Sequence, residues 1–150
     1  DMLKIAMGCD HAGYDMKEEI KEKLIKEGYI INDLGTCSKE SVDYPDFGIK
    51  VGESVAKGEC DFGIAICGSG IGISISANKV KGVRAALVCD EERASLARMH
   101  NNANVLAIGA RFTDIDTAKK IVGTFLATPF EGQRHEKRIN KINEYENKLK

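Results

Sequence analysis

The sequence of 150 residues predicts an α/β fold with three layers, and two observations support that prediction. Short apolar runs of strand length alternate along the chain with amphipathic segments of helical period. Neighbouring parallel strands need crossover helices that bury their apolar stripes, so this alternation gives a doubly wound parallel sheet covered on both faces. No repeat, low-complexity stretch or linker divides the chain, and we expect one domain over residues 1–150.

The first part of the chain supplies two strands and two helices. Leu3–Gly8 is a compact apolar run, typical of a buried strand. Apolar residues then recur every fourth position over Met16–Leu24, opposite lysines and glutamates, and Gly28 ends this helix. Tyr29–Leu34 is the second strand. The next buried stripe, Pro45–Gly58, begins with a proline, which a first helical turn accepts, and ends at a glycine.

The middle of the chain supplies two more strands and two more helices. Phe62–Cys67 is the third strand, and a glycine-rich turn separates it from a short helix near Ile73–Lys79. Val83–Val88 is the fourth strand. Asp90 suits the N-cap of the helix Glu91–His100, because its carboxylate can accept a hydrogen bond from a first-turn N–H group.

The end of the chain adds a fifth strand and two helices. Val105–Ile108 is the strand, Ala118–Phe125 marks the fifth helix, and apolar positions within Ile139–Leu149 indicate a charged terminal helix. We expect the Rossmann-like strand order 2-1-3-4-5, with a helical tail over residues 130–150. That order places the carboxyl ends of strands one and three on either side of the topological switch point, where ligands bind.

Composition excludes several classes of protein. The 22 Lys and Arg residues nearly cancel the 23 Asp and Glu residues, so the net charge of -1 gives no electrostatic case for binding nucleic acid or an anionic membrane. With 43% apolar and 30% charged residues, the chain can bury a core and does not resemble a disordered protein. No apolar run approaches the roughly 18 residues of a membrane helix, and the N-terminus lacks a signal-peptide pattern, so we expect a cytoplasmic protein.

The cysteines and histidines give no sign of a metal site. The five cysteines are odd in number, widely spaced and without a C-x-x-C motif, which argues against a disulfide framework and against zinc. The three histidines are also scattered, so no ligand cluster is apparent. A cysteine that takes part in chemistry would therefore act alone.

Two polar residues, Asp10 and His11, follow the first strand directly. They lie at the predicted crevice and just before a helix, so they are suited to contact a ligand. The alternative is structural: Asp10 caps the helix and His11 is solvated. Their position at the switch point favours the first interpretation.

Three alternate glycines follow the third strand, in the segment Cys67–Gly72. Their successive N–H groups can converge on a phosphate, a carboxylate or a developing oxyanion without side chains in the way. A P-loop is excluded because no Gly-Lys-Ser/Thr ends the segment, and a cysteine phosphatase because Ile73 stands where it needs arginine. The dinucleotide fingerprint fails at the same residue, although Asp90 lies where a ribose-binding acid would.

Cys67 itself lies between the strand and a helix N-terminus, where the helix dipole and the N–H groups favour a thiolate. It could act as a base or a nucleophile. It could also be an inert core cysteine, since free cysteine is among the most buried residue types. The residues alone leave both interpretations open.

Cations and polar groups gather in the second half of the chain. The polar segment His100–Asn104 ends the fourth helix, and its simplest role is a C-cap with asparagine in the left-handed conformation. Arg134, His135 and Arg138 are spaced to share one helical face, and Arg111 follows the fifth strand directly. Arginine suits phosphate oxygens, although a solvated basic face explains the tail equally well.

Together these groups match the needs of proton transfer between adjacent carbons of a sugar phosphate. That reaction needs a base, an anion hole for an enediolate, an acid or base to open the sugar ring, and cations for the phosphate. The sequence offers each of them, with two histidines and an aspartate expected near the same edge of the sheet as the thiol.

Several motifs in order then coincide with a known family. They are Gly8–Gly13, Ser41–Asp46, Cys67–Gly72, Ala77–Lys79, His100–Asn101 with Ala103–Asn104, and Gly109–Arg111. On these motifs the chain resembles ribose-5-phosphate isomerase type B, from about Leu3 to about Ile142. The resemblance implies interconversion of ribose 5-phosphate and ribulose 5-phosphate through a cis-enediolate, without a metal or another cofactor. It also implies a homodimer, or a dimer of dimers, with active sites between subunits and the helical tail at the interface.

The resemblance also implies roles for single residues. Cys67 corresponds to the base that moves the proton between C2 and C1, and Ser69 to an assisting hydroxyl. Asp10 and His100 correspond to the ring-opening groups, with His100 as the proton carrier. The enediolate hole would consist of the amides of Gly68, Gly70, Ile71 and Gly72. The sugar hydroxyls would contact Tyr44 and Asn101. The phosphate clamp would consist of His11, Arg111, Arg134, His135 and Arg138.

Two departures and two alternatives accompany the resemblance. A branch of the family uses a glutamate six positions after the cysteine, but Ile73 stands there, which leaves Cys67 as the only base in the loop. Ser69 replaces a frequent threonine and keeps the hydroxyl. Allose-6-phosphate and galactose-6-phosphate isomerases use the same scaffold and are alternative functions. A non-catalytic module that binds a sugar phosphate or nucleotide is the other alternative, and it would keep its affinity in Cys67→Ala.

Overall fold

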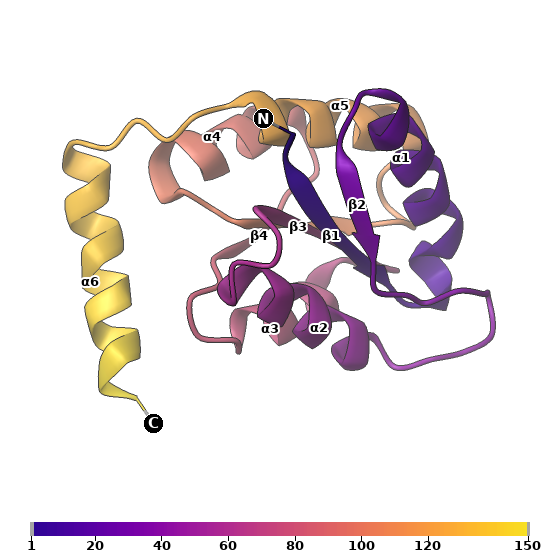
Figure 1. Ribbon diagram of the computed structural model, residues 1–150, viewed down its shortest axis with the longest axis horizontal. Coiled ribbons are helices and arrows are strands. Elements are labelled where there is room, and N and C mark those ends of the chain that lie inside the picture. The colour runs from indigo at the N-terminus through magenta and orange to yellow at the C-terminus, as the bar shows by residue number, and fades with distance from the viewer. Residues whose placement is uncertain (1, 150) are drawn as a thin grey trace.

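The computed structural model describes residues 2–149 and contains one parallel five-stranded sheet between two layers of helices (Figure 1). The strands are β1 (Lys4–Cys9), β2 (Ile30–Asp33), β3 (Phe62–Cys67), β4 (Ala85–Leu87) and β5 (Val105–Gly109). The helices are the 3-10 helix η1 (His11–Gly13), α1 (Tyr14–Lys26), α2 (Tyr44–Ala56), α3 (Ile71–Asn78), α4 (Glu91–Asn101), α5 (Ile115–Ala127) and α6 (Arg134–Lys148). Every predicted strand and helix is present, so the α/β prediction is confirmed. Within residues 2–149, no helix has both the length and the apolarity needed to cross a membrane.

The strand order is β2-β1-β3-β5-β4, so the predicted order 2-1-3-4-5 is wrong in its last two places. β5 lies inside the sheet, paired with both β3 and β4, and all five of its residues are buried. β4 forms the edge, has only three residues and is partly exposed, so it is also shorter than the predicted Val83–Val88.

Right-handed crossovers relate this strand order to the two layers of helices. The chain moves across the sheet in the same direction from β1 to β2 and from β4 to β5, so right-handed connections place α1 and α4 on one face, together with α5 (Figure 1). It moves the opposite way from β2 to β3 and from β3 to β4, which places α2 and α3 on the other face. In the predicted order α4 would have joined α2 and α3.

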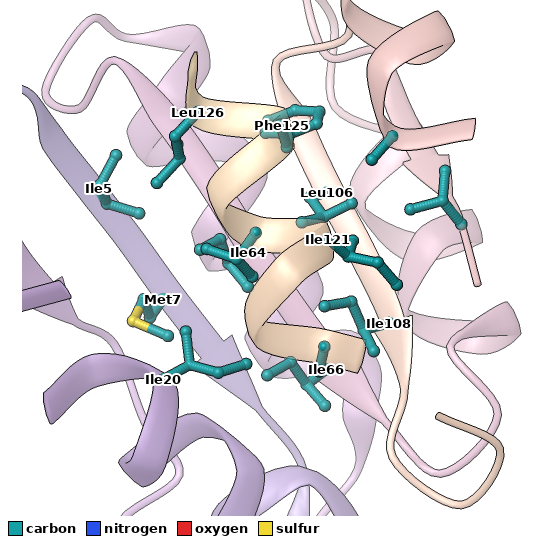
Figure 2. Packing of buried hydrophobic residues seen from close by; sticks show 14 of the residues in the cluster. Ile5, Met7, Ile20, Ile64, Ile66, Leu106, Ile108, Ile121, Phe125 and Leu126 are labelled. Carbon is teal, nitrogen blue, oxygen red and sulfur yellow. The ribbon is translucent and has the colours of Figure 1, made fainter. Parts of the chain in front are cut away.

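The two faces of the sheet carry side chains of different size. Toward α1, α4 and α5 the central strands present large residues such as Ile64 and Leu106, which pack with Phe125 of α5 in the larger core (Figure 2). Toward α2 and α3 the same strands present small residues such as Ala65 and Cys67. The thiol of Cys67 therefore faces the α2 and α3 layer, at the end of β3.

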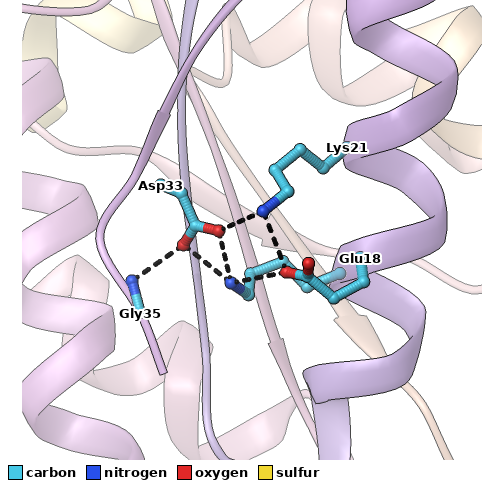
Figure 3. A network of polar contacts seen from close by, with 5 residues as sticks. Glu18, Lys21, Asp33 and Gly35 are labelled. Atoms are coloured by element: carbon cyan, nitrogen blue, oxygen red, sulfur yellow. Dashed lines mark hydrogen bonds and ion pairs between the residues drawn. The ribbon is translucent and has the colours of Figure 1, made fainter. Parts of the chain in front are cut away.

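An ion-pair network around the buried Lys17 fixes the end of β2 against α1 (Figure 3). Lys17 is 1% exposed, and its Nζ donates to both carboxylate oxygens of Asp33 at 2.7 Å and lies 3.1 Å from Glu18. Lys21 and the backbone N–H of Gly35 also donate to Asp33. Burial alone would raise the pKa of Asp33, but these hydrogen bonds outweigh it and hold the pKa below its ordinary value.

Candidate active site

The strands β3 and β5 end side by side, and backbone hydrogen bonds join the segments that follow them. The N–H of Ala110 donates to the carbonyl of Cys67, and the N–H of Arg111 donates to the carbonyl of Gly68, both at 2.9 Å. Arg111 therefore lies beside the glycine loop only because β5, and not β4, is the neighbour of β3.

A solvent-open cavity of about 430 Å³ lies at this carboxyl edge of the sheet. It joins residues that follow β1, β3 and β5 to the first turns of α2 and α3. Its lining consists of Asp10, Tyr44, Cys67, Gly68, Ser69, Ile71, Gly72, Ile75 and Arg111. All of these except Ile75 were predicted as site residues, so the structure gathers one part of the predicted site in one place.

Cys67 lies at the floor of the loop and is 4% exposed. Its Sγ accepts a hydrogen bond from the backbone N–H of Gly70, with a nitrogen-to-sulfur distance of 3.2 Å. A donor directed at the sulfur stabilises negative charge there. Burial raises the pKa of another cysteine, Cys9 at the end of β1, to about 12 and keeps that thiol protonated.

The glycine loop follows a path that only glycine permits at Gly70. Gly70 has a φ of 79°, in the left-handed region, and a Cβ there would lie 2.8 Å from the backbone nitrogen of Gly109. The turn leads into α3, whose first N–H, that of Ile71, donates to the hydroxyl of Ser69 at 3.1 Å. The first turn of α3, with Ile71 and Gly72, thus lines the cavity.

Two side chains pack directly on this loop. The guanidinium of Arg111 lies against Gly68, where a Cβ would come within 2.7 Å of its Nη1. The ring of Tyr44 covers Gly72 so closely that a Cβ would overlap it. The Arg111 guanidinium therefore covers the start of the loop at Gly68, and the Tyr44 phenol covers its end at Gly72.

Asp10 and His11 hold the turn after β1. Asp10 is 6% exposed and accepts a hydrogen bond from the N–H of Gly13 at 3.1 Å, so the predicted cap is present, and the same side chain also lines the cavity. His11 accepts a hydrogen bond at Nδ1 from the N–H of Val42 at 3.2 Å, which leaves Nε2 as the protonated nitrogen of the neutral ring. This contact ties the turn to the segment that leads into Tyr44.

The remaining predicted residues lie elsewhere in the same chain. A helix that follows a parallel strand runs back toward the amino edge of the sheet, so His100 and Asn101 at the end of α4 lie at the opposite edge from Cys67. The prediction that His100 shares an edge with Asp10 is therefore wrong. Asn102 is the left-handed C-cap of this helix, with a φ of 44°, as the sequence predicted.

Helix α6 contains the other three predicted phosphate-binding residues, Arg134, His135 and Arg138, and it lies away from the cavity (Figure 1). It stands at the side of the molecule and contacts α4 (Figure 1). The three residues lie in one helix as predicted, but their exposure differs: His135 turns inward and is 5% exposed, whereas Arg134 and Arg138 are exposed. The reason is that His135 and Ile139 form the buried stripe that packs toward α4.

The rings of His100 and His135 stack on each other, with centroids 4.2 Å apart and planes 12° from parallel. Glu131 Oε1 lies 3.6 Å from Nε2 of His100 and 3.5 Å from Nε2 of His135. Desolvation, followed by the charges of His100 and Arg134, lowers the pKa of His135. The spacing of these three ligand atoms would suit a metal ion. The parallel rings do not, because in-plane lone pairs on two stacked imidazoles cannot converge on one ion.

Comparison with known proteins assigns the chain to a family. Its residues 5–142 match the family model described as Ribose/Galactose Isomerase. The chain belongs to this family. It is 47% identical over 141 residues to ribose-5-phosphate isomerase B of Escherichia coli, a match that covers 94% of this chain and 95% of the relative.

Solved structures of family members have the same fold. Ribose-5-phosphate isomerase B of Clostridium thermocellum is 53% identical, with a TM-score of 0.96 over 97% of this chain and 99% of the other. Ribose-5-phosphate isomerase B of Mycoplasma genitalium with bound ribulose-5-phosphate is 45% identical, with a TM-score of 0.96 over 99% of this chain and 100% of the other. The prediction that the chain is an isomerase, made from its motifs, is confirmed.

Two residues of interest were absent from the predicted site. Ile75 lines the cavity one helical turn after Ile71, and both are more than half exposed, an arrangement that the helical spacing of the two isoleucines could have indicated. Glu131 lies in the loop between α5 and α6 and contacts both His100 and His135. No pattern in the sequence indicates these contacts.

Proposed function

We propose that the enzyme interconverts ribose 5-phosphate and ribulose 5-phosphate through a cis-enediolate, with Cys67 as the proton-transferring base. The observation that carries the proposal is the position of the Cys67 thiol, which lines an open cavity beside the N-terminus of α3 and accepts a hydrogen bond from Gly70. The family membership and the relative with bound ribulose-5-phosphate support the substrate.

The chemistry follows from the groups around the thiol. The Cys67 thiolate takes the proton from C2 of the open-chain aldose, and the electron pair of that C–H bond forms the C1–C2 double bond of an enediolate. At the same time the π pair of the C1 carbonyl moves onto O1, which takes up a proton while O2 loses one. Return of the proton from the Cys67 thiol to C1, with formation of the C2–O2 double bond, gives the ketose and restores the thiolate. In our proposal the amides of Gly68, Gly70, Ile71 and Gly72 act as the hole for the negative charge that develops on O1, and Gly68, Ile71 and Gly72 line the cavity itself. The hydroxyl of Ser69 assists beside them.

Ring opening and phosphate binding need residues from both edges of the sheet. Ribose 5-phosphate is a cyclic hemiacetal, so a proton must reach its ring oxygen before C2 can react. In our proposal His100 and Asp10 move that proton, Tyr44 and Asn101 hold the hydroxyls, and the phosphate lies among the predicted cations. Within one chain, however, His100 lies at the amino edge and the cavity at the carboxyl edge.

A second copy of the chain removes this separation. We therefore place the site between the subunits of a homodimer, with Asp10, His11, Cys67 and Arg111 from one protomer. The partner contributes the groups of its α4 end and its tail, which are His100, Asn101, Arg134, His135 and Arg138. Exposed apolar side chains next to the cavity, Ile71, Ile75 and Phe112, provide the kind of surface that such a contact buries.

The experiment that tests the catalytic base is Cys67→Ala. We expect this variant to lose isomerisation, measured by conversion of ribose 5-phosphate, while calorimetry still detects binding of ribulose 5-phosphate. Cys60→Ala, at a buried cysteine outside the cavity, is the control. Near-native turnover in Cys67→Ala would exclude the thiol as the base. If the native protein itself showed no turnover, the non-catalytic module that binds a sugar phosphate or nucleotide would be the remaining function.

A second candidate substrate is galactose 6-phosphate, because the family description covers galactose as well as ribose isomerases. Allose 6-phosphate is the further hexose of the same class. Comparison of kcat/KM for the three sugar phosphates decides between them, and our proposal expects the highest value for ribose 5-phosphate.

A further inference from the structure

The cluster of Glu131, His100 and His135 holds two titratable rings and one carboxylate in direct contact. Each Nε2 is within 3.6 Å of the same Glu131 oxygen. His135 Nε2 is buried and has no hydrogen-bond partner among the described residues, since its contact with Glu131 is longer than a normal hydrogen bond. Exposure separates the two histidine side chains, at 37% for His100 and 6% for His135.

These contacts determine which of the two histidine rings is the more favourable site for a positive charge. Two imidazolium rings stacked 4.2 Å apart repel each other, so protonation of one ring disfavours protonation of the other. Burial disfavours charge on His135, and the charges of Arg134 and Arg138 act in the same direction. His100 is the more exposed ring and faces the Glu131 carboxylate, so the charge falls on His100.

The chain holds Glu131 in this place by contacts to the end of α4. The N–H of Glu131 donates to the carbonyl of Met99 at 3.1 Å. Arg98, which is 7% exposed, donates to the carbonyls of Thr128 and Ala103 and so clamps the loop before Glu131 to the helix end. The carboxylate is thus set beside His100 before any substrate arrives.

We infer that Glu131 is the positioning residue of ring opening: its carboxylate orients the His100 imidazole and stabilises its protonated form, while His135 serves as a neutral stacking platform. The inference rests on the proposed function, in which His100 delivers a proton to the sugar ring. It assigns His135 to support of His100 and not to direct charge on the phosphate.

The test is Glu131→Gln, with two readouts. Titration of the His100 ring protons by NMR, with His100→Asn to assign the resonance, should have its midpoint at a lower pH than in the native protein. Turnover of ribose 5-phosphate should show a kcat about ten-fold lower with little change in KM. Because an acid loses its proton above its pKa, the decline of kcat at high pH should begin at lower pH than in the native enzyme. Glu131→Asp should restore part of both effects.

Glu136→Gln is the matched control, because Glu136 is exposed in the first turn of α6 and, among the described residues, its carboxylate forms no ion pair with either histidine. An unchanged His100 pKa in Glu131→Gln overturns the inference. A lowered pKa with unchanged kcat overturns it as well. When Glu131→Gln gives either of these results, the turnover of His100→Asn separates the two levels. Full activity of His100→Asn refutes the proposed role of His100, whereas lost activity leaves that role standing and refutes only the role of Glu131.

Discussion

The guanidinium of Arg111 lies directly against Gly68, and its backbone N–H donates to the carbonyl of that same glycine. A cation from the end of β5 is thereby fixed next to the loop that follows β3. The contact depends on the absence of a side chain at Gly68, which makes the glycine necessary for the position of the arginine.

Gly68→Ala should therefore weaken binding of the phosphorylated sugar. The added methyl would lie 2.7 Å from Nη1 of Arg111. Because the guanidinium is the end of a flexible side chain, Arg111 can move aside without unfolding the protein. We expect KM to rise about ten-fold, because loss of one charge-assisted hydrogen bond costs about 1.5 kcal/mol. Steady-state kinetics measures this, and an unchanged KM would show that Arg111 does not hold the substrate. Gly123→Ala, at a helical position of α5 where a Cβ meets no other atom within 4 Å, is the control for general effects on the fold.

Gly70→Ala should act on the loop itself. The residue has a positive φ, and its Cβ would meet backbone atoms of β5, which cannot move aside as a side chain can. We expect loss of most isomerase activity together with a lower Tm, measured by kinetics and thermal unfolding. Native kcat in this variant would show that the N–H contact from Gly70 to Cys67 is dispensable.

Subunit mixing should demonstrate a shared site. Cys67→Ala and His100→Asn homodimers should each be inactive, and unfolding and refolding them together in equal amounts should restore about a quarter of native activity, since half of the dimers then contain one intact site. Recovery of no activity, with heterodimers confirmed by mass spectrometry, would place Cys67 and His100 of one chain in the same site or in none.

Arg138→Ala should raise KM for ribose 5-phosphate without a comparable fall in kcat. Arg138 is exposed on α6 and far from the cavity of its own chain, so an effect on KM requires that it reaches the site of the partner. Lys141→Ala, an exposed cation one turn further along α6, is the matched control. Equal effects of the two substitutions would indicate a general electrostatic influence instead of a phosphate contact.

Asp33→Asn should lower the free energy of unfolding by about 2 kcal/mol at pH 7, because it leaves the buried Lys17 without its main partner. The folded protein holds the pKa of Asp33 below its ordinary 3.8, so the stabilisation is fully present above that value and is lost as the pH falls through the folded pKa. The difference between native protein and variant in urea unfolding should therefore shrink below about pH 4. Glu22→Gln, at an exposed pair, should change little.

Local features of the site could be predicted from the sequence because they depend on neighbouring residues. A glycine-rich turn after an apolar strand and before a helix has few possible geometries, so Cys67, the loop amides and the cap at Asp10 lie where the sequence placed them. The extents of β3 and α4 also follow from short-range patterns of apolar residues and caps.

What required the tertiary structure were the relationships between distant segments. The strands β4 and β5 have similar apolar sequences, and only the packing of α4 on the same face as α1 decides that β5 lies inside the sheet and brings Arg111 to Gly68. The direction of α4 carries His100 to the opposite edge, and the fold of the tail turns His135 inward onto it beside Glu131. Sequence determined which groups are available, because residue type and local spacing are intrinsic to the chain. The crossovers of the sheet decided which of them meet.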